Sequence, residues 1–181
     1  MIIEDREIHT NNINYTIRSA IYTDATELSK LRLQIDGETE NLDREKGEGY
    51  IDEPGFRLII NEDTNKARNL FLVAIVSGKI VAFSRCEGFY LNRFSHKVEF
   101  GVCVLKDYWG YGIGGFLLEE TIYWADSIGI KKITLSVLET NVNAIRLYKK
   151  FGFEIEGILK NDKKLSDGKF YNTIIMGRFI E

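Results

Sequence analysis

The chain of 181 residues contains only two cysteines, two histidines and one proline. Cys86 and Cys103 lie inside apolar, strand-like runs, so we expect buried free thiols and no disulfide framework. His9 and His96 have no Cys, His or carboxylate neighbour at the spacing of a metal site, and we therefore predict no metal. With Pro54 as its single proline, the chain shows no proline-rich linker that would divide it.

The chain also lacks a long apolar run and a large charge of one sign. No run approaches the ~20 apolar residues that span a bilayer, and the first residues are acidic rather than a basic-then-apolar export signal. The 24 Lys and Arg residues stand against 27 Asp and Glu, and a net charge of −3 offers no basic face to a nucleic-acid backbone. These absences predict a cytoplasmic protein with neither a membrane nor a nucleic-acid partner.

The residues that are present are those of one globular domain. Hydrophobic residues make up 44% and charged residues 28%, a balance typical of folded proteins with a single core. We therefore predict one domain over residues 1–181, in which residues 1–14 form an irregular N-terminal extension.

Strand-like and helical apolar patterns alternate along the chain. Ser77-Gly78 suits a tight turn, so the strands on either side of it should be antiparallel neighbours. In chain order we expect a strand at 15–21, helices beginning near 24 and 52, strands at 70–76, 79–90 and 96–105, a helix at 112–128, a strand at 132–138, a helix at 141–151, and strands at 153–159 and 170–179. This order predicts an α/β (α+β) fold in which helices cover a mixed sheet.

A glycine-rich turn joins the fourth predicted strand, 96–105, to the following helix. Its four glycines are Gly110, Gly112, Gly114 and Gly115. Because glycine lacks a Cβ and the first N–H groups of a helix have no internal partner, an anion can approach this backbone closely. The positive end of the helix dipole adds to the attraction, and the natural ligand is a pyrophosphate. Glycine runs also serve tight turns and close helix packing, which is the alternative interpretation.

Two other phosphate-binding motifs do not fit this turn. A dinucleotide-binding Rossmann fingerprint follows the first strand of its unit, whereas this turn comes after four predicted strands. A Walker loop needs Gly-Lys-Ser/Thr, but Phe116 and Leu117 follow Gly115.

A second motif lies downstream and, together with the turn, resembles the GNAT family of N-acetyltransferases. It consists of Asn141-x-x-Ala144, the pair Leu147-Tyr148 and then Gly152-Phe153. The turn, Trp109-Gly-Tyr-Gly112-Ile-Gly114, matches the coenzyme motif Arg/Gln-x-x-Gly-x-Gly/Ala of that family except at Trp109. The resemblance implies a mixed, mostly antiparallel sheet of about seven strands flanked by about four helices, and an N-acetyltransferase that uses acetyl-CoA.

The resemblance also implies which residues hold the coenzyme. In the family, backbone N–H groups of the turn hold the pyrophosphate, which here are those of Trp109, Gly110, Tyr111, Gly112, Ile113, Gly114 and Gly115. Val102 and Val104 are expected beside the pantetheine arm, where a backbone N–H can stabilise the oxyanion. Asn141 and Asn143 are expected to contact the coenzyme, and Asn141 is also suited to cap the helix.

The implied chemistry is direct attack of an amine on the acetyl carbonyl, without a covalent enzyme intermediate. Tyr148 is expected near the thioester sulfur, where its hydroxyl can donate a proton to the departing thiolate. A tyrosine on an apolar helix stripe is otherwise a core residue. Glu99 stands where many relatives carry a base, and its alternative role is that of a solvent-facing strand residue.

The segment 34–53 is rich in carboxylates and is expected beside the acceptor. It contains Arg44 and Lys46 against Asp36, Glu38, Glu40, Asp43, Glu45, Glu48, Asp52 and Glu53. Such a field would attract a small cationic amine or a polyamine, although a charge run is also typical of a solvated face.

Two alternatives for the function stay open. The tail, with Glu156-Gly-Ile-Leu-Lys160, Asp167-Gly-Lys-Phe-Tyr171 and Met176, resembles the branch that contains ribosomal-protein N-terminal acetyltransferases, whose substrate is a protein amine. The same fold can also serve as a sensor that binds acetyl-CoA without turnover. Relatives often dimerise, so a homodimer is compatible with the resemblance, but the sequence does not fix the oligomeric state.

Overall fold

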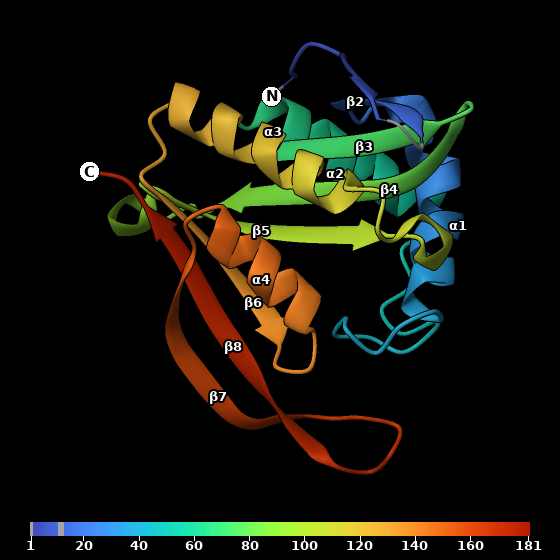
Figure 1. The fold of residues 1–181 in the computed structure, drawn as a ribbon. Coiled ribbons are helices and arrows are strands. Elements are labelled where there is room, and N and C mark those ends of the chain that lie inside the picture. The colour runs from blue at the N-terminus through green and yellow to red at the C-terminus, as the bar shows by residue number, and fades with distance from the viewer. Residues whose placement is uncertain (1, 11–12) are drawn as a thin grey trace.

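A computed structural model describes residues 2–10 and 13–181. They form one eight-stranded sheet, in the order β1-β2-β3-β4-β5-β6-β8-β7, with helices on both faces (Figure 1). Within these residues β5 and β6 are the one parallel pair, and the other neighbours are antiparallel. The predicted mixed, mostly antiparallel sheet and its four α-helices are confirmed, with eight strands in place of about seven.

The elements follow the predicted order along the chain. The strands are β1 Arg6–His9, β2 Asn14–Ser19, β3 Leu70–Val76, β4 Lys79–Gly88, β5 Lys97–Val104, β6 Lys132–Leu138, β7 Glu154–Lys164 and β8 Phe170–Phe179. The α-helices are α1 Ala25–Asp36, α2 Glu53–Asn65, α3 Ile113–Ser127 and α4 Val142–Lys150. The turn between β3 and β4 is the predicted one, with positive φ at Ser77 (48°) and Gly78 (78°). No helix among the described residues is long and apolar enough to cross a membrane.

The prediction of an irregular extension over residues 1–14 is wrong, because β1 lies inside it. Arg6–His9 pairs with β2 and places Ile8, which is buried, opposite Tyr15. With one apolar side chain facing the core in four residues, β1 is too short to show the alternation that identifies a strand. Residues 1, 11 and 12 of the expected extension lie outside the described residues.

The sheet separates into two halves between β5 and β6. Their parallel pairing runs only from Lys97 opposite Lys132 to Glu99 opposite Thr134. Beyond these residues the two strands diverge, as Figure 1 shows for β5 and the group of β6, β7 and β8. The last part of β5 therefore pairs with β4 on one side and with no strand on the other.

The helices divide between the two faces of the sheet. Apolar residues of α3, with Tyr148 of α4, pack on one face in the larger buried cluster. Leu28, Leu31 and Phe56, from α1 and α2, pack on the other face in the second cluster. Because neighbouring residues of a strand point to opposite faces, β5 presents alternate side chains to these two layers.

Four weak acids, of which Tyr15, Tyr148 and Cys86 are buried and Cys103 is partly exposed, give the fold a definite response to high pH. Burial raises the pKa of Tyr15, Tyr148 and Cys103 to about 12, and it raises the pKa of the Cys86 thiol further. Both cysteines are free thiols. In the unfolded chain these groups lose their protons at lower pH than in the folded protein, so the unfolded state binds fewer protons as the pH rises from 9 toward 12.

We therefore expect the free energy of unfolding to fall above pH 9, by about 1.4 kcal/mol per pH unit for each group in its window. Urea unfolding at a series of pH values measures this slope. Tyr15→Phe is the test variant, because the Tyr15 hydroxyl is buried without a hydrogen-bond partner in the described structure and its loss should cost little. Between pH 10 and 12 this variant should show a shallower slope than the wild type, and an unchanged slope would contradict the assignment.

Candidate active site

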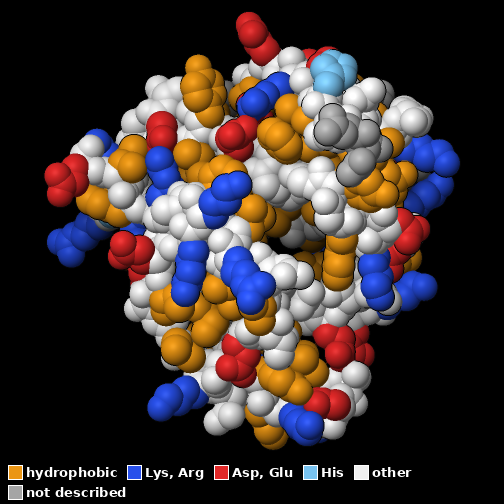
Figure 2. Space-filling model, in the orientation of Figure 1, with side chains coloured by type: hydrophobic (Ala, Val, Ile, Leu, Met, Phe, Trp, Pro, Cys, Tyr) orange, Lys and Arg blue, Asp and Glu red, His pale blue; other side chains and the backbone are white. Residues whose placement is uncertain are grey.

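Two cavities meet where β5 and β6 separate. The strand cavity, of about 620 Å³, is floored by β4 and β5, and the turn cavity, of about 640 Å³, is bounded by the glycine-rich turn and α4. The residues that line both are Asn41, Leu42, Val102, Cys103, Asn141 and Tyr148. Figure 2 shows the surface hollowed near its centre, at the place where α4 faces the end of β5 in Figure 1. A ligand in one cavity can therefore meet a ligand in the other.

The glycine-rich turn has the backbone of an anion site. Gly110 and Gly112 have φ values of 86° and 81°, a region that residues with a Cβ rarely adopt. The first helical N–H bond of α3 runs from Phe116 to the carbonyl of Gly112 at 3.0 Å, so the N–H groups of residues 113–115 have no partner within the helix. At the positive end of a 15-residue helix, these groups suit a diphosphate.

Packing alone does not explain the glycines of this turn. A Cβ at Gly110 would meet no atom within 4 Å, and a Cβ at Gly114 would approach a methyl of Val104 at 3.7 Å, an ordinary contact. Gly114 also has no positive φ that would require glycine. Close approach of a ligand to the backbone is the remaining physical reason for a glycine at this position.

Trp109 stands at the start of the turn, where the family pattern has Arg or Gln. Its indole N–H donates to the carbonyl of Val104 at 2.8 Å, so the side chain fixes the turn to the end of β5. Its 44% exposure leaves it at the rim of the turn cavity. Because Trp109 is uncharged, its side chain does not attract a diphosphate electrostatically. At this turn the attraction comes from the backbone N–H groups and the helix dipole.

The end of β5 offers unpaired backbone groups to both cavities. The N–H of Leu105 donates to the carbonyl of Val81 in β4 at 3.0 Å. Along a strand, the N–H and C=O groups of successive residues point to opposite sides. Leu105 points toward β4, so the N–H and C=O groups of Val102 and the N–H of Val104 point away from β4. They face the gap that β6 has left, at the junction of the two cavities.

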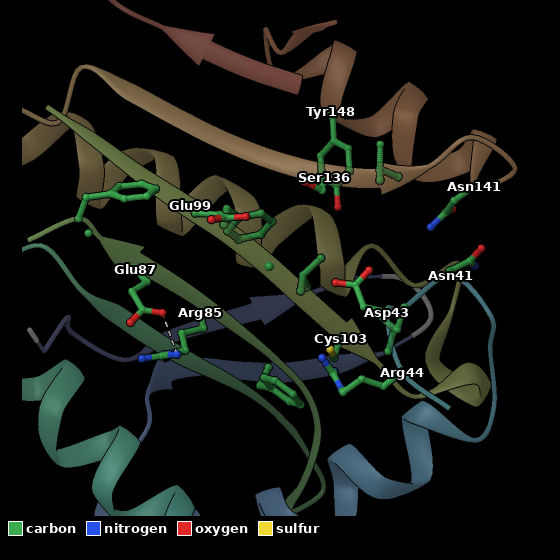
Figure 3. Close-up of a pocket in the computed structure, with 18 of the residues that line it drawn as sticks. Asn41, Asp43, Arg44, Arg85, Glu87, Glu99, Cys103, Ser136, Asn141 and Tyr148 are labelled. Atoms are coloured by element: carbon green, nitrogen blue, oxygen red, sulfur yellow. Dashed lines mark ion pairs between the residues drawn. The ribbon is translucent and has the colours of Figure 1, made fainter. Parts of the chain in front are cut away.

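Tyr148 of α4 lies across this gap. The residue is 7% exposed, and Figure 3 shows its side chain directed from α4 toward the gap. Burial raises the pKa of its hydroxyl to about 12, so the hydroxyl keeps its proton at neutral pH. Asn141 accepts a hydrogen bond from the N–H of Ala144 at 3.3 Å, which confirms its role as the helix cap. Tyr148 therefore places a neutral, protonated hydroxyl between the two cavities.

The floor of the strand cavity consists of three cross-strand pairs. They are Phe83 with Cys103, Arg85 with Gly101, and Glu87 with Glu99. Arg85 is held by Asp63 of α2 through two hydrogen bonds of 2.6 and 3.0 Å, and it forms an ion pair with Glu87 at 3.0 Å. Asp63 and Glu87 together carry more charge than the one guanidinium group of Arg85. Glu99, opposite Glu87, adds a further negative charge at this end of the cavity (Figure 3).

The acidic segment 34–53 adds little charge to the strand cavity itself, while six of its carboxylates line a neighbouring cavity of about 1010 Å³: Asp36, Glu38, Glu40, Asp43, Glu45 and Glu48. Of its carboxylates only Asp43 lines the strand cavity, among the residues that the structure describes. Several others support the fold: Glu38 and Glu40 accept hydrogen bonds from the N–H groups of Lys106 and Ser166, both at 2.8 Å. Most of the negative charge of this segment is therefore not available to hold a ligand in the strand cavity.

The structure brings together most of the predicted site residues. Those that line the turn cavity are Val102, Val104, Trp109, Gly110, Gly112, Ile113, Gly114, Gly115, Asn141, Asn143 and Tyr148. Glu99 lines the strand cavity instead, and Tyr111 lines neither cavity. Sequence reasoning missed Arg44, Arg85, Gly101 and Ser136 of the strand cavity. The alternation of positions 83, 85 and 87 toward one face of β4 was the available signal for Arg85.

Three comparisons place the chain among known proteins. The model of the family described as "Acetyltransferase (GNAT) family" matches residues 37–153. An L-amino acid N-acetyltransferase of Escherichia coli is 34% identical over 108 residues, which cover 59% of this chain and 66% of that protein. A probable spermine N(1)-acetyltransferase of Bacillus subtilis subsp. natto is 44% identical over 55 residues, which cover 30% of this chain and 36% of that protein. The chain thus matches less than two thirds of the length of either relative.

A solved structure extends this similarity to the whole fold. The crystal structure of a GNAT acetyltransferase from Streptococcus pneumoniae superposes with a TM-score of 0.88 at 29% identity. The match covers 92% of this chain and 99% of the other.

Proposed function

The chain belongs to the GNAT family of acetyltransferases, and we propose that it moves an acetyl group from acetyl-CoA to a primary amine of a small molecule. The observation that carries this proposal is the junction of the two cavities at Tyr148 and the unpaired backbone of Val102. An acyl donor in the turn cavity and an amine in the strand cavity would meet there in a ternary complex.

In this proposal the residues of the turn cavity bind and orient the donor. The N–H groups of residues 113–115 hold the diphosphate, and the backbone of Val102 and Val104 lies along the pantetheine arm. The N–H of Val102 stabilises the oxyanion that forms when the amine attacks. Tyr148 donates its proton to the thiolate as the carbon–sulfur bond breaks.

Glu99 is proposed as a base that acts through water. It lies three residues before Val102, which corresponds to about 10 Å along a strand. This separation is too long for direct proton transfer from an amine at the Val102 amide, but a short water chain can bridge it. Its side chain lies on the same face of β5 as Gly101 and Cys103, toward the strand cavity.

A small acceptor is favoured over a protein N-terminus by the enclosing residues. Segment 34–53 borders the site through Asn41, Leu42, Asp43 and Arg44, and Asp43 is tied to β7 by its ion pair with Lys163. The names of the two relatives point to different amines, an amino acid and spermine. The specific observation in favour of a cationic amine or a polyamine is the pair Glu87 and Glu99 at the far end of the strand cavity.

Calorimetry with acetyl-CoA followed by a thiol-release screen tests the proposal. The screen should include small amines, polyamines and peptide N-termini. We expect binding of acetyl-CoA and thiol release with small amines. Binding without thiol release on the whole panel would favour the sensor, and release only with peptides would favour a protein N-terminal acetyltransferase.

Gly101 offers a test of where the acceptor lies. A Cβ at this position would meet no atom within 4 Å, and its φ is not positive, so neither packing nor backbone conformation requires glycine. We expect Gly101→Val to stabilise the protein by about 0.5–1 kcal/mol in urea unfolding, because glycine weakens strands. Its side chain would enter the strand cavity, and the KM for the amine should rise about tenfold at unchanged acetyl-CoA affinity.

The matched control is Gly157→Val in β7. A Cβ there also meets no atom within 4 Å, and Gly157 lines neither cavity. This variant should keep the wild-type KM. A KM that stays unchanged in Gly101→Val as well would contradict the placement of the acceptor over β5.

A further inference from the structure

Two arginines share one carboxylate beside the strand cavity. Arg44 approaches Asp36 through its Nη2 and Nε atoms at 3.1 and 3.3 Å, and Arg32 approaches the same carboxylate at 3.9 Å. Arg32 is 9% exposed and donates a further hydrogen bond, of 2.6 Å, to the carbonyl of Gly49. A carbonyl carries no net charge, so this group of two cations and one anion has an excess positive charge.

Neighbouring carboxylates do not remove this excess. Asp43 precedes Arg44 in the chain but forms its ion pair with Lys163. Within the described part of the chain, Asp36 is the one carboxylate paired with Arg32 or Arg44 within 4 Å. Burial and then the charge of Arg44 lower the pKa of Arg32, which agrees with two cations that lie close together.

The excess charge lies at the reacting end of the strand cavity. Arg44 lines this cavity, and Figure 3 shows its guanidinium group next to Cys103, on the opposite side of the gap from Tyr148. Cys103 follows Val102, whose N–H is proposed to stabilise the oxyanion. A group bound to Arg44 would therefore lie close to the amine that reacts.

A guanidinium group recognises carboxylates through a planar fork of donors. In Arg44 the Nη1 atom and one N–H of Nη2 are not used by Asp36. An ammonium group at the same place would be repelled, so a polyamine would have to keep its second charge at the distant pair Glu87 and Glu99.

We infer that Arg44 binds the carboxylate of the acceptor, and that the acceptor is an α-amino acid. This inference rests on the proposed acetyl transfer to a small amine. In an α-amino acid the carboxylate and the amine are attached to one carbon, so a carboxylate at Arg44 holds the amine beside the Val102 amide. The side chain of the amino acid then extends over Gly101, where the floor of the cavity has no side chain, toward Arg85 and Glu87.

The test compares L-amino acids with their carboxamides, which keep the amine and lose the negative charge. We expect wild-type protein to acetylate at least one amino acid with a kcat/KM about 100-fold above that of its amide, as for a charge-assisted hydrogen-bonded pair. Arg44→Gln should lower kcat/KM for the amino acid about 100-fold, through KM, and leave that for the amide unchanged. Arg44→Lys keeps the positive charge but lacks the planar fork of donors. Its kcat/KM for the amino acid should lie between those of the wild type and Arg44→Gln.

Arg44→Gln is a favourable variant because it leaves Asp36 with Arg32 as a balanced pair, so we expect it to fold. Calorimetry should show wild-type affinity for acetyl-CoA, since Arg44 does not line the turn cavity. Equal use of acid and amide by the wild type, an equal loss with both in Arg44→Gln, or a preference for spermidine would overturn the inference while leaving acetyl transfer intact. Absence of thiol release with every amine would overturn the proposed function itself.

Discussion

Replacement of Tyr148 by phenylalanine is expected to lower kcat about 100-fold without a change in acetyl-CoA affinity. General acids contribute roughly 10²- to 10⁴-fold, and we expect the low end because a thiolate is a fair leaving group without help. The ring can stay where it packs against Phe153, at 5.8 Å between centroids, since only the hydroxyl is removed. Thiol release under saturating substrates measures kcat, and calorimetry measures the affinity.

Tyr123→Phe is the control for this variant. Tyr123 lies on α3 with 74% exposure and lines neither cavity, so its hydroxyl should be irrelevant to turnover. A Tyr148→Phe protein whose kcat stays within about threefold of the wild type would show that another group protonates the thiolate. The pKa of about 12 adds a further expectation, because Tyr148 should not limit the rate at any pH up to about 11.

Replacement of Gly112 by aspartate should weaken acetyl-CoA binding about 100-fold or more. Two effects combine, since Gly112 has a φ of 81° and its neighbours direct free N–H groups toward the proposed diphosphate. A carboxylate at this place would repel the phosphates and compete for the same donors.

Gly112→Asn separates these two effects. Asparagine has nearly the shape of aspartate and, like it, tolerates a positive φ, but it is uncharged. Both variants should lose similar stability in urea unfolding, whereas the asparagine variant should bind acetyl-CoA within about tenfold of the wild type. Calorimetry on the folded proteins measures the acetyl-CoA affinity of each variant. Equal affinities of the two variants would mean that the turn does not hold a negative ligand.

The glycine turn and the helix that carries Tyr148 could be predicted from sequence because each is local. Gly110 to Gly115 and Asn141 to Tyr148 each form one short run, so their spacing shows which groups share one turn or one helix face. The separation of β5 from β6 could not be predicted in this way. It depends on where two strands that are distant in sequence stop pairing, and each strand has an ordinary pattern of its own.

The strand cavity was missed for a related reason. Its charged residues come from four separate segments: Asp43 and Arg44 from the loop before α2, Lys66 from the end of α2, Arg85 and Glu87 from β4, and Glu99 from β5. At segment 34–53 a count of charges predicts an acidic surface, but it does not show which of these side chains reach the strand cavity. In the structure Glu38 and Glu40 accept hydrogen bonds from backbone N–H groups, and the charged residues of this segment that line the strand cavity are Asp43 and Arg44.

The separation of β5 from β6 has one more consequence, for association between molecules. An unpaired strand edge is a template for another chain and commonly leads to aggregation, so proteins blunt or cover such edges. Here the open edge of β5 lies in a hollow, between the strands it has left and the loop before α2, rather than at the outer edge of the sheet. A strand from another chain would have to enter this hollow to pair with β5, which a flat, fully exposed edge strand would not require.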